Sequence, residues 1–294
     1  MSEASLFSAA RLAFHAALLE GGLLCITARK KPKKTLPAEF PSNADGDSAT
    51  SIAIAQAIFD QIQSEAVVSG RLAGQISGSK FEQVTRSFVQ QTFSALKMIR
   101  PGKWDFAPQK RAILRFEQYH HLAELSDLAD KNPQLAVLLG SDYVIAPDVL
   151  IVREPESDEV INAEQYVVDH TVALRSSMRR RNNELPILHA SISCKWTLRS
   201  DRAQNARSEA LKLIRNRKGK LPHIAVVTGE PIPSRLASLA LGTGDIDCVY
   251  HFALPELIAS VGALGIEDSA HLVRIMVNGK RLKDISDLPL DLAL

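Results

Sequence analysis

Residues 191–209 read SISCKWTLRSDRAQNARSE, and they open with polar and apolar side chains in alternation. Because successive side chains of a strand point to opposite faces, Ser191, Ser193 and Lys195 should share one face, while the apolar residues between them enter the core. A lysine on an inner strand requires a partner, because an unpaired buried charge is costly. An anionic site that contains a metal ion or a phosphate would supply that partner.

Charged residues follow this strand directly. Arg199, Asp201 and Arg202 stand at the start of a helix that we expect over residues 202–218. Guanidinium and carboxylate groups at a helix start can read base edges in a major groove. Asp201 is equally suited to cap the helix, and the two roles are compatible. The whole stretch favours a metal-dependent DNA endonuclease.

The composition is that of an ordinary globular chain. Of the 294 residues, 46% are hydrophobic and 23% are charged, and the net charge is +2. Any DNA-binding surface must therefore be a local patch. Cys25, Cys194 and Cys248 lack zinc-site spacing and indicate a reducing cytoplasm. His15 and Glu20 interrupt the apolar N-terminal stretch, so we expect neither a signal peptide nor a membrane span.

Hydrophobic periodicity and turn residues predict a mixed α/β chain. Helices are expected over residues 5–20, 51–66, 79–98, 111–129, 133–139, 202–218, 233–240 and 255–263. Strands are expected over 147–152, 188–196, 224–228 and 248–254, with a glycine-rich turn over 70–78 and a further strand in the tail from Arg274. No low-complexity linker divides the chain, so we expect one domain with an N-terminal subregion.

Four groups suggest catalysis. Asp148 begins one expected strand, Ser193 and Lys195 share a face of the next, and Glu209 borders the apolar stripe of the following helix. Hydrolysis of a phosphodiester needs a cation and a group that activates water. Mg²⁺ prefers oxygen ligands and commonly takes one or two carboxylates. We therefore predict that Asp148 and Glu209 bind Mg²⁺, together with the carbonyl of Cys194, and that Lys195 holds the attacking water.

Each of these residues also has a structural interpretation. Asp148 follows Pro147 and could start its strand through a turn. Lys195 could extend its ammonium group to solvent from the strand end. Glu209 could be a solvated helix residue that pairs with Lys212. The spacing of the residues leaves these alternatives open.

Several segments spread along the chain resemble one family of nucleases. These segments are Ser42–Gly46, Gly74–Glu82, Gly140–Tyr143 with Pro147-Asp148, His189–Glu209, Arg215–Gly219, Pro233–Arg235, Gly244–Leu254 and Met276–Asp284. On these motifs the chain resembles the CCGG family of type II restriction endonucleases, within the PD-(D/E)xK nuclease superfamily. The resemblance implies a central mixed β-sheet flanked by helices, with a catalytic core at residues 71–294. It also implies an N-terminal helical subregion at residues 1–70 that carries a DNA-contacting loop.

The resemblance also assigns catalytic roles. The catalytic set of the family falls on Glu82, Asp148, Ser193, Lys195 and Glu209. Ser193 departs from the superfamily pattern, in which an acidic residue stands two positions before the lysine. Glu209 is then the residue that supplies the missing carboxylate from the helix.

Base reading is implied in the same way. Arg199, Asp201 and Arg202 would read the central CCGG, while the outer G·C pair would be read by Arg235 and Asp45, with Gln75 in the minor groove. Arginine matches guanine O6 and N7, and a carboxylate accepts a hydrogen bond from cytosine N4. The implied target is the double-stranded palindrome GCCGGC, cut to leave a 5′-phosphate and a 3′-hydroxyl.

A palindromic target calls for a two-fold symmetric dimer. By resemblance, two such dimers would form a homotetramer, and a separate DNA methyltransferase would protect the host. A structure-selective repair or resolvase nuclease and a DNA-binding protein without catalytic activity are the alternative functions. The basic run Arg29–Lys34 is either a solvated loop or an arm on DNA phosphates, and Arg179–Arg181 is expected to be solvated.

Overall fold

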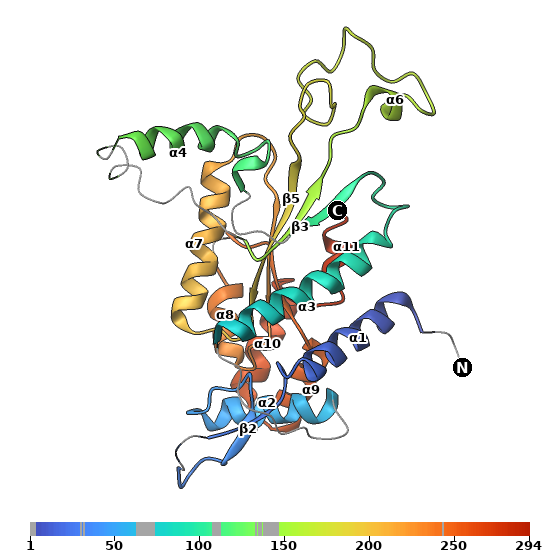
Figure 1. The fold of residues 1–294 in the computed structure, drawn as a ribbon. Coiled ribbons are helices and arrows are strands. Elements are labelled where there is room, and N and C mark those ends of the chain that lie inside the picture. Colours follow the sequence, from blue (N-terminus) through green and yellow to red (C-terminus); the bar gives the residue numbers. More distant parts are fainter. Residues whose placement is uncertain are drawn as a thin grey trace. The chain divides into compact units, whose positions relative to one another are not determined.

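The computed structural model describes residues 4–29, 31, 33–62, 74–107, 113–132, 134, 137, 147–242 and 244–294 (Figure 1). Its strands are β1 (Ile26–Ala28), β2 (Glu39–Pro41), β3 (Trp104–Ala107), β4 (Val149–Arg153), β5 (Ile187–Lys195), β6 (His223–Thr228), β7 (Cys248–His251) and β8 (Leu282–Asp284). Its helices in the first half are α1 (Leu6–Glu20), α2 (Ala49–Ile62), α3 (Gly74–Ser94), the 3₁₀ helix η1 (Ile113–Arg115) and α4 (His121–Lys131). The later helices are α6 (Asp158–Ile161), α7 (Ser200–Asn216), α8 (Pro233–Ala240), α9 (Leu254–Ala263), α10 (Glu267–Asn278) and α11 (Leu288–Asp291).

A mixed six-stranded sheet flanked by helices confirms the expected fold class. Its strand order is β3-β4-β5-β6-β7-β8, and β1 pairs with β2 in a separate two-stranded sheet. The pairs β3–β4 and β4–β5 are antiparallel, whereas β6–β7 and β7–β8 are parallel. Strands β4 and β6 are apolar on nearly every residue because both of their faces are covered. None of the described helices is long and apolar enough to cross a membrane.

The chain divides into two compact units that are interleaved in sequence. The first contains residues 1–95, 193–207 and 225–294, and the second contains residues 96–192 and 208–224. The expected N-terminal subregion therefore shares a unit with the C-terminal part of the chain. Strand β5 and helix α7 each contribute residues to both units.

Aromatic side chains organise the core of the first unit. Helix α1 lies alongside α3 (Figure 1), where Phe14 meets Phe88 with their ring centroids 5.4 Å apart. Phe81 of α3 packs edge-on against Trp196 at 5.1 Å, and Trp196 packs against Phe252 at 5.5 Å. Trp196 is 5% exposed, as its place on the apolar face of β5 predicted. The end of β5 is thus clamped between α3 and the end of β7.

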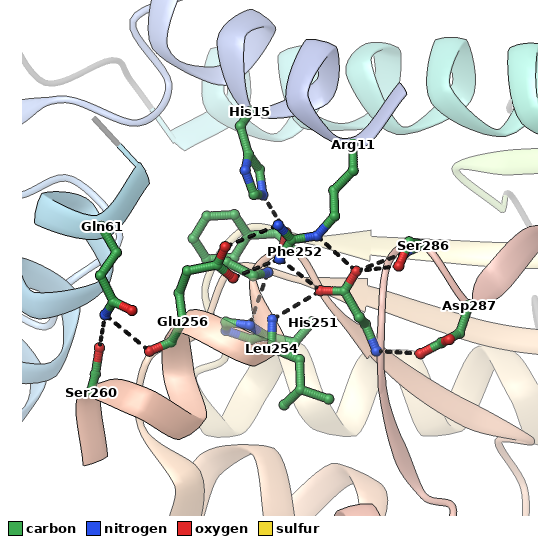
Figure 2. Close-up of polar contacts among 12 residues, drawn as sticks. Arg11, His15, Gln61, His251, Phe252, Leu254, Glu256, Ser260, Ser286 and Asp287 are labelled. Carbon is green, nitrogen blue, oxygen red and sulfur yellow. Dashed lines mark hydrogen bonds and ion pairs between the residues drawn. The ribbon is translucent and has the colours of Figure 1, made fainter. Parts of the chain in front are cut away.

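Arg11 ties α1 to two distant parts of the same unit (Figure 2). Its guanidinium donates to both carboxylate oxygens of Glu256 on α9, at 2.9 and 2.6 Å, and to both oxygens of Asp284 on β8, at 2.9 and 3.1 Å. His15, one turn later, donates from Nε2 to the carbonyl of Phe252 at 2.7 Å. Burial alone would raise the pKa of Asp284, but hydrogen bonds from Arg11 and Ser286 lower it below its ordinary value.

Two predicted elements were wrong. The helix expected over 111–129 is interrupted, because residues 117–120 form turns between η1 and α4; there the side chain of Gln118 pairs with Leu188 of β5, donating at 2.7 Å and accepting at 3.0 Å. The strand expected from Arg274 is the second half of α10, where Val273 and Met276 form a buried stripe at helical spacing. Helix α10 ends at Asn278, and the chain turns at Gly279 and Lys280, whose φ is 56°.

Several element boundaries also differ from the expected ones. The glycine-rich turn is helical from Gly74 onward, and most of the helix expected over 133–139 lies outside the described residues. Helix α7 begins at Ser200, so Asp201 lies in its first turn and is not its N-cap. The strand expected over 248–254 ends at His251, because Pro255 stands in the first turn of α9.

The expectation of solvation for Arg179 was also wrong. Its side chain lies in the long segment between β4 and β5 (residues 154–186), here called the excursion, and is 1% exposed. It donates to both carboxylate oxygens of Asp158, at 2.8 and 2.6 Å, and to the carbonyl of Asp169 at 2.9 Å. Arg181, two residues later, is exposed as expected. One arginine of the run therefore organises the excursion from inside.

Replacement of Arg11 by Met should lower the free energy of unfolding by roughly 2–4 kcal/mol, because two carboxylates lose their common partner. The value lies below that of a fully buried network, since the side chains of Arg11 and Glu256 are 18% and 16% exposed. Denaturant unfolding at pH 7 measures the change. Arg274→Met, at an exposed position of α10, should cost less than about 0.5 kcal/mol; equal losses in the two variants would contradict the role of Arg11.

The same network predicts that the stability of the folded protein depends on pH. The pKa values of Asp284 and Glu256 are lowered from ordinary values of 3.8 and 4.5. Their ionised forms therefore stabilise the folded state above about pH 4, and this contribution is lost as the pH falls through the folded-state pKa values. The difference in the free energy of unfolding between wild type and Arg11→Met should therefore become smaller as the pH falls below about 4.

Candidate functional site

Three of the six predicted base-reading residues lie together in the first unit. Asp45 lies in the loop between β2 and α2, Arg199 directly precedes α7, and Arg235 is in the first turn of α8. They line a polar cavity of about 360 Å³, whose wall consists of Asp45, Asp47, Leu198, Arg199, Ala203, Arg235 and Ser238. Residues 190 positions apart in sequence thus meet at one surface.

Asp45 and Arg235 form an ion pair at this cavity. Arg235 donates from Nη2 to Oδ2 of Asp45, and the side chains are 31% and 27% exposed. The hydrogen bond from Arg235 is the main reason that the pKa of Asp45 lies below its ordinary value, and the charge of Arg199 adds to it. Asp45 is therefore ionised at neutral pH. A paired carboxylate and guanidinium present an acceptor and donors side by side, which is the set that a G·C pair requires.

The Asp45 loop is held by Arg29, the first residue of the basic run. The guanidinium of Arg29 donates to the carbonyls of Gly46 and Pro37 and lies 5.1 Å from the centre of the Phe40 ring. Phe40 in turn packs on Gly46, where a Cβ atom would lie 2.7 Å from the ring. Lys33 pairs with Asp47 at 2.6 Å. Arg29 is thus neither solvated nor part of an arm, while Lys31 and Lys34 are exposed.

Glu230 is a buried carboxylate behind the cavity. It is 0% exposed, and Oε2 accepts the backbone N–H of Leu198 at 2.8 Å, while Oε1 accepts that of Ile232 at 3.1 Å. Nη1 of Arg235 lies 3.7 Å from Oε2. Burial raises the pKa of Glu230 to about 7, although its two backbone hydrogen bonds and the nearby guanidinium act in the opposite direction.

The other three predicted base-reading residues have different surroundings. Asp201 is exposed in the first turn of α7. Arg202 turns back, donating to Oγ1 of Thr197 at 2.9 Å and to its carbonyl at 3.3 Å. Gln75 is exposed in the first turn of α3. Arg202 must release or share Thr197 before its guanidinium can contact a base.

The predicted catalytic residues divide between the two units. Glu82 lies on α3, and Ser193, Cys194 and Lys195 form the end of β5; these four belong to the first unit. Asp148, directly before β4, and Glu209, in the middle of α7, belong to the second unit. Ser193 and Cys194 are buried, whereas Lys195, Glu82, Asp148 and Glu209 are half-buried. Such partial burial suits charged groups that must meet both water and a substrate.

The predicted metal ligands are chemically suited to Mg²⁺. Carboxylates of Asp148 and Glu209 with a main-chain carbonyl are hard oxygen donors, and Mg²⁺ keeps waters in its remaining positions. Within the described ranges no group of three or more His, Cys, Asp or Glu side chains is placed to hold a metal ion. All three cysteine side chains are buried, and none of them forms a disulfide. The chain therefore offers oxygen ligands and no zinc-type thiolate cluster among these residues.

Two buried residues of the first unit were missed by sequence reasoning. Glu230 stands in the run HIAVVTGEPIP, and a lone acid among apolar residues between a strand and a helix is the signal of a buried charge. Asn43 donates from Nδ2 to the carbonyl of Gly229 at 2.9 Å and is 1% exposed. No local pattern singles out Asn43, because its partner is 186 residues away.

Comparison with known proteins identifies the family of the chain. The model of the NgoMIV restriction enzyme family matches residues 14–294. The type II restriction enzyme NgoMIV of Neisseria gonorrhoeae is 52% identical over 293 residues, which cover 98% of this chain and 99% of that enzyme. A match of this extent includes both units and every candidate residue. The chain therefore belongs to the NgoMIV family of type II restriction endonucleases, and it is a site-specific endonuclease that binds double-stranded DNA.

Proposed function

We propose that this endonuclease recognises GCCGGC and hydrolyses each strand with Mg²⁺, leaving a 5′-phosphate and a 3′-hydroxyl. The observation that carries the target is the meeting of Asp45, Arg199 and Arg235 around one polar cavity. Arg235 offers donors for guanine O6 and N7, and Asp45 accepts from cytosine N4, so the pair would read the outer G·C. Arg199, Asp201 and Arg202 would read the central CCGG, and Gln75 would approach from the minor groove.

The proposed catalytic centre draws on the ends of two paired strands. Val149 of β4 pairs with Ile192 of β5, so Asp148 precedes one member of this pair and Ser193 follows the other. This position of each residue at the end of its strand supports a joint role for Asp148 and the Ser193-Cys194-Lys195 end, as the resemblance to the family implies. Glu209 would supply the second carboxylate from α7, and Glu82 would complete the acidic set from α3.

Each catalytic residue then has a defined task. Asp148, Glu209 and the Cys194 carbonyl would hold Mg²⁺, which when bound neutralises phosphate charge and lowers the pKa of bound water. Ser193 would stand where the superfamily has an acidic residue, and Glu209 would supply that carboxylate from α7. Lys195 would orient the attacking water and stabilise the charge that develops on the phosphate oxygens.

Self-assembly is part of the proposal. A palindromic target is matched by a two-fold dimer, and pairing of dimers would give a homotetramer. The excursion between β4 and β5 supports this, because it exposes Val160, Tyr166, Val167, Val172 and Leu174 by 45–75%. Clustered exposed apolar side chains mark interaction surfaces. We further propose that the 294 residues act as one domain in the cytoplasm, where buried free thiols persist, beside a separate protective methyltransferase.

Digestion of plasmid DNA and mapping of the ends tests the target and the chemistry together. We expect cleavage at GCCGGC that requires Mg²⁺ and that yields ends which ligase rejoins without prior kinase treatment. Plasmids with a single changed outer base pair serve as controls. Cleavage at every CCGG, irrespective of the outer pair, would refute the proposed target.

Substitution of Lys195 by Ala should abolish Mg²⁺-dependent cleavage and preserve specific binding in Ca²⁺, because only the chemical step loses its positive group. Gel-shift binding and single-turnover cleavage measure the two properties separately. Lys131→Ala, on the exposed last turn of α4, is the matched control and should cleave normally. Retained cleavage in Lys195→Ala would remove this lysine from the mechanism.

Arg235→Ala should weaken discrimination at the outer base pair by about 1–3 kcal/mol and leave discrimination at the central pairs nearly unchanged. The measurement is equilibrium binding in Ca²⁺ to duplexes changed at one position each. The central positions are the internal control. An unchanged preference at the outer pair would overturn the assignment of Arg235.

A further inference from the structure

Gly229 and Glu230, between β6 and α8, contact all three segments that carry the cavity-lining base-reading residues. The segments are the Asp45 loop, the turn from β5 to α7 and the first turn of α8. These three segments are remote in sequence, so a common anchor must set the spacing of their side chains. Gly229 and Glu230 themselves lie outside the set of residues proposed to contact DNA.

Gly229 supplies two of the anchoring contacts through its backbone. Its N–H donates to the carbonyl of Trp196 at 3.1 Å, and its own carbonyl accepts from Nδ2 of Asn43 at 2.9 Å. A Cβ atom at Gly229 would lie 2.6 Å from the Trp196 ring. Only glycine permits this approach, which connects the end of β5 to the loop that carries Asp45.

Glu230 supplies the remaining contacts through its side chain. One carboxylate oxygen accepts the N–H of Leu198, the residue before Arg199, and the other accepts the N–H of Ile232, at the start of α8. The guanidinium of Arg235 faces the same carboxylate at 3.7 Å. A single buried group thus orients the backbone next to Arg199 and the side chain of Arg235.

The backbone of Glu230 is fixed from the opposite side by His251 of β7. Nδ1 of His251 accepts the N–H of Ala253 at 3.1 Å, so Nε2 carries the proton and donates to the carbonyl of Glu230 at 3.2 Å. Burial lowers the pKa of His251 to about 4, so the ring is neutral at physiological pH. His251 therefore acts as a fixed support that does not titrate near neutrality.

We propose that Glu230 is a positioning residue for base recognition, which holds Arg235 and the Leu198-Arg199 turn in the arrangement that reads the outer G·C pair. The inference rests on the proposed function, because it takes Arg235 and Asp45 as readers of that pair. Asp45 holds Arg235 from the cavity side, and Glu230 holds it from the interior. When DNA draws Arg235 toward a guanine, Glu230 remains behind it as the orienting charge.

The ionisation of Glu230 makes this role dependent on pH. The charged groups that face Glu230 are Arg235 from α8 and Asp45 from the β2–α2 loop, while neutral His251 contacts it from β7. Its carboxylate takes up a proton near neutrality, whereas Asp45 and Arg235 keep their charges. Protonation removes the charge that faces Arg235 and weakens an acceptor. Discrimination at the outer pair should therefore decrease as the pH falls from 8 to 6.

The test measures equilibrium binding in Ca²⁺ to three duplexes, which contain GCCGGC, a changed outer pair or a changed central pair, at pH 6, 7 and 8. Glu230→Gln keeps the size of the side chain but places an N–H₂ group against backbone donors or Arg235. We expect this variant to lose about tenfold in outer-pair discrimination at pH 8 and to lose its pH dependence. Glu267→Gln, an exposed carboxylate on α10, is the matched control and should behave as wild type.

Two further measurements keep the outcome decisive if Glu230→Gln fails to fold. The wild-type pH profile requires no variant, and Asn43→Ala removes only the tie between the Asp45 loop and Gly229. We expect the wild type to discriminate less at the outer pair below pH 7. We expect Asn43→Ala to discriminate less than the wild type at all three pH values. A flat wild-type profile, or wild-type discrimination in folded Glu230→Gln, would overturn the inference.

Arg235→Ala separates this inference from the function on which it depends. If Arg235→Ala leaves outer-pair discrimination unchanged, the assignment of the base readers is wrong. If Arg235→Ala impairs outer-pair discrimination and Glu230→Gln does not, the assignment of the base readers is supported and only the role of Glu230 is wrong.

Discussion

A charge that is removed from water needs an opposite charge or several hydrogen bonds, and this requirement shapes the described parts of the chain. Arg11 meets it with two carboxylates, Arg179 meets it with Asp158 and main-chain carbonyls, and Arg29 meets it with the carbonyls of its own loop. Arg11 joins segments that are distant in sequence, whereas Arg179 and Arg29 each hold one local part of the chain in place. Burial of charge here therefore fixes the path of the chain as well as its local packing.

The same requirement gives the recognition surface its rigidity. Glu230 cannot remain ionised inside the protein without the N–H groups of Leu198 and Ile232, so those two segments are held at a set distance. Asp45 and Arg235 are paired at the cavity before any DNA is present. A surface that is ordered in advance loses less conformational freedom on binding, and this improves discrimination between closely similar sites. In the proposed recognition, DNA would still compete with the contacts that Arg235 and Arg202 make within the protein.

Recognition and catalysis are also connected along the chain. Lys195 ends β5, Trp196 is clamped by aromatic rings, and Leu198 is held by Glu230, all within four residues. A displacement of Arg199 is therefore transmitted to Lys195 by a short segment whose position is fixed by these contacts. This arrangement provides a physical route by which base contacts of Arg199 would align Lys195, the lysine proposed to act in catalysis.

Local patterns were sufficient for much of the fold. The alternation in residues 191–196 predicted β5, and the helical stripe of 233–240 predicted α8 with its bounds, because both depend on the faces that neighbouring residues share. Family motifs selected Asp45, Arg199 and Arg235 as base readers, and the three lie around one cavity. Periodicity failed at Gln118, which lies in a turn and whose side chain bonds to a strand 70 residues away, and at Arg274–Asn278, where the structure has a helix in place of the expected strand.

The amino-acid sequence by itself determined the family, the main strands and helices, and the residue types that can read bases and bind a cation. Only the tertiary structure decided which charges are buried and what they hold: Arg29 under the Asp45 loop, Arg179 inside the excursion, and Glu230 behind Arg235. The reason is physical. Burial and pairing depend on neighbours that are up to 273 residues away, and no local spacing encodes those contacts.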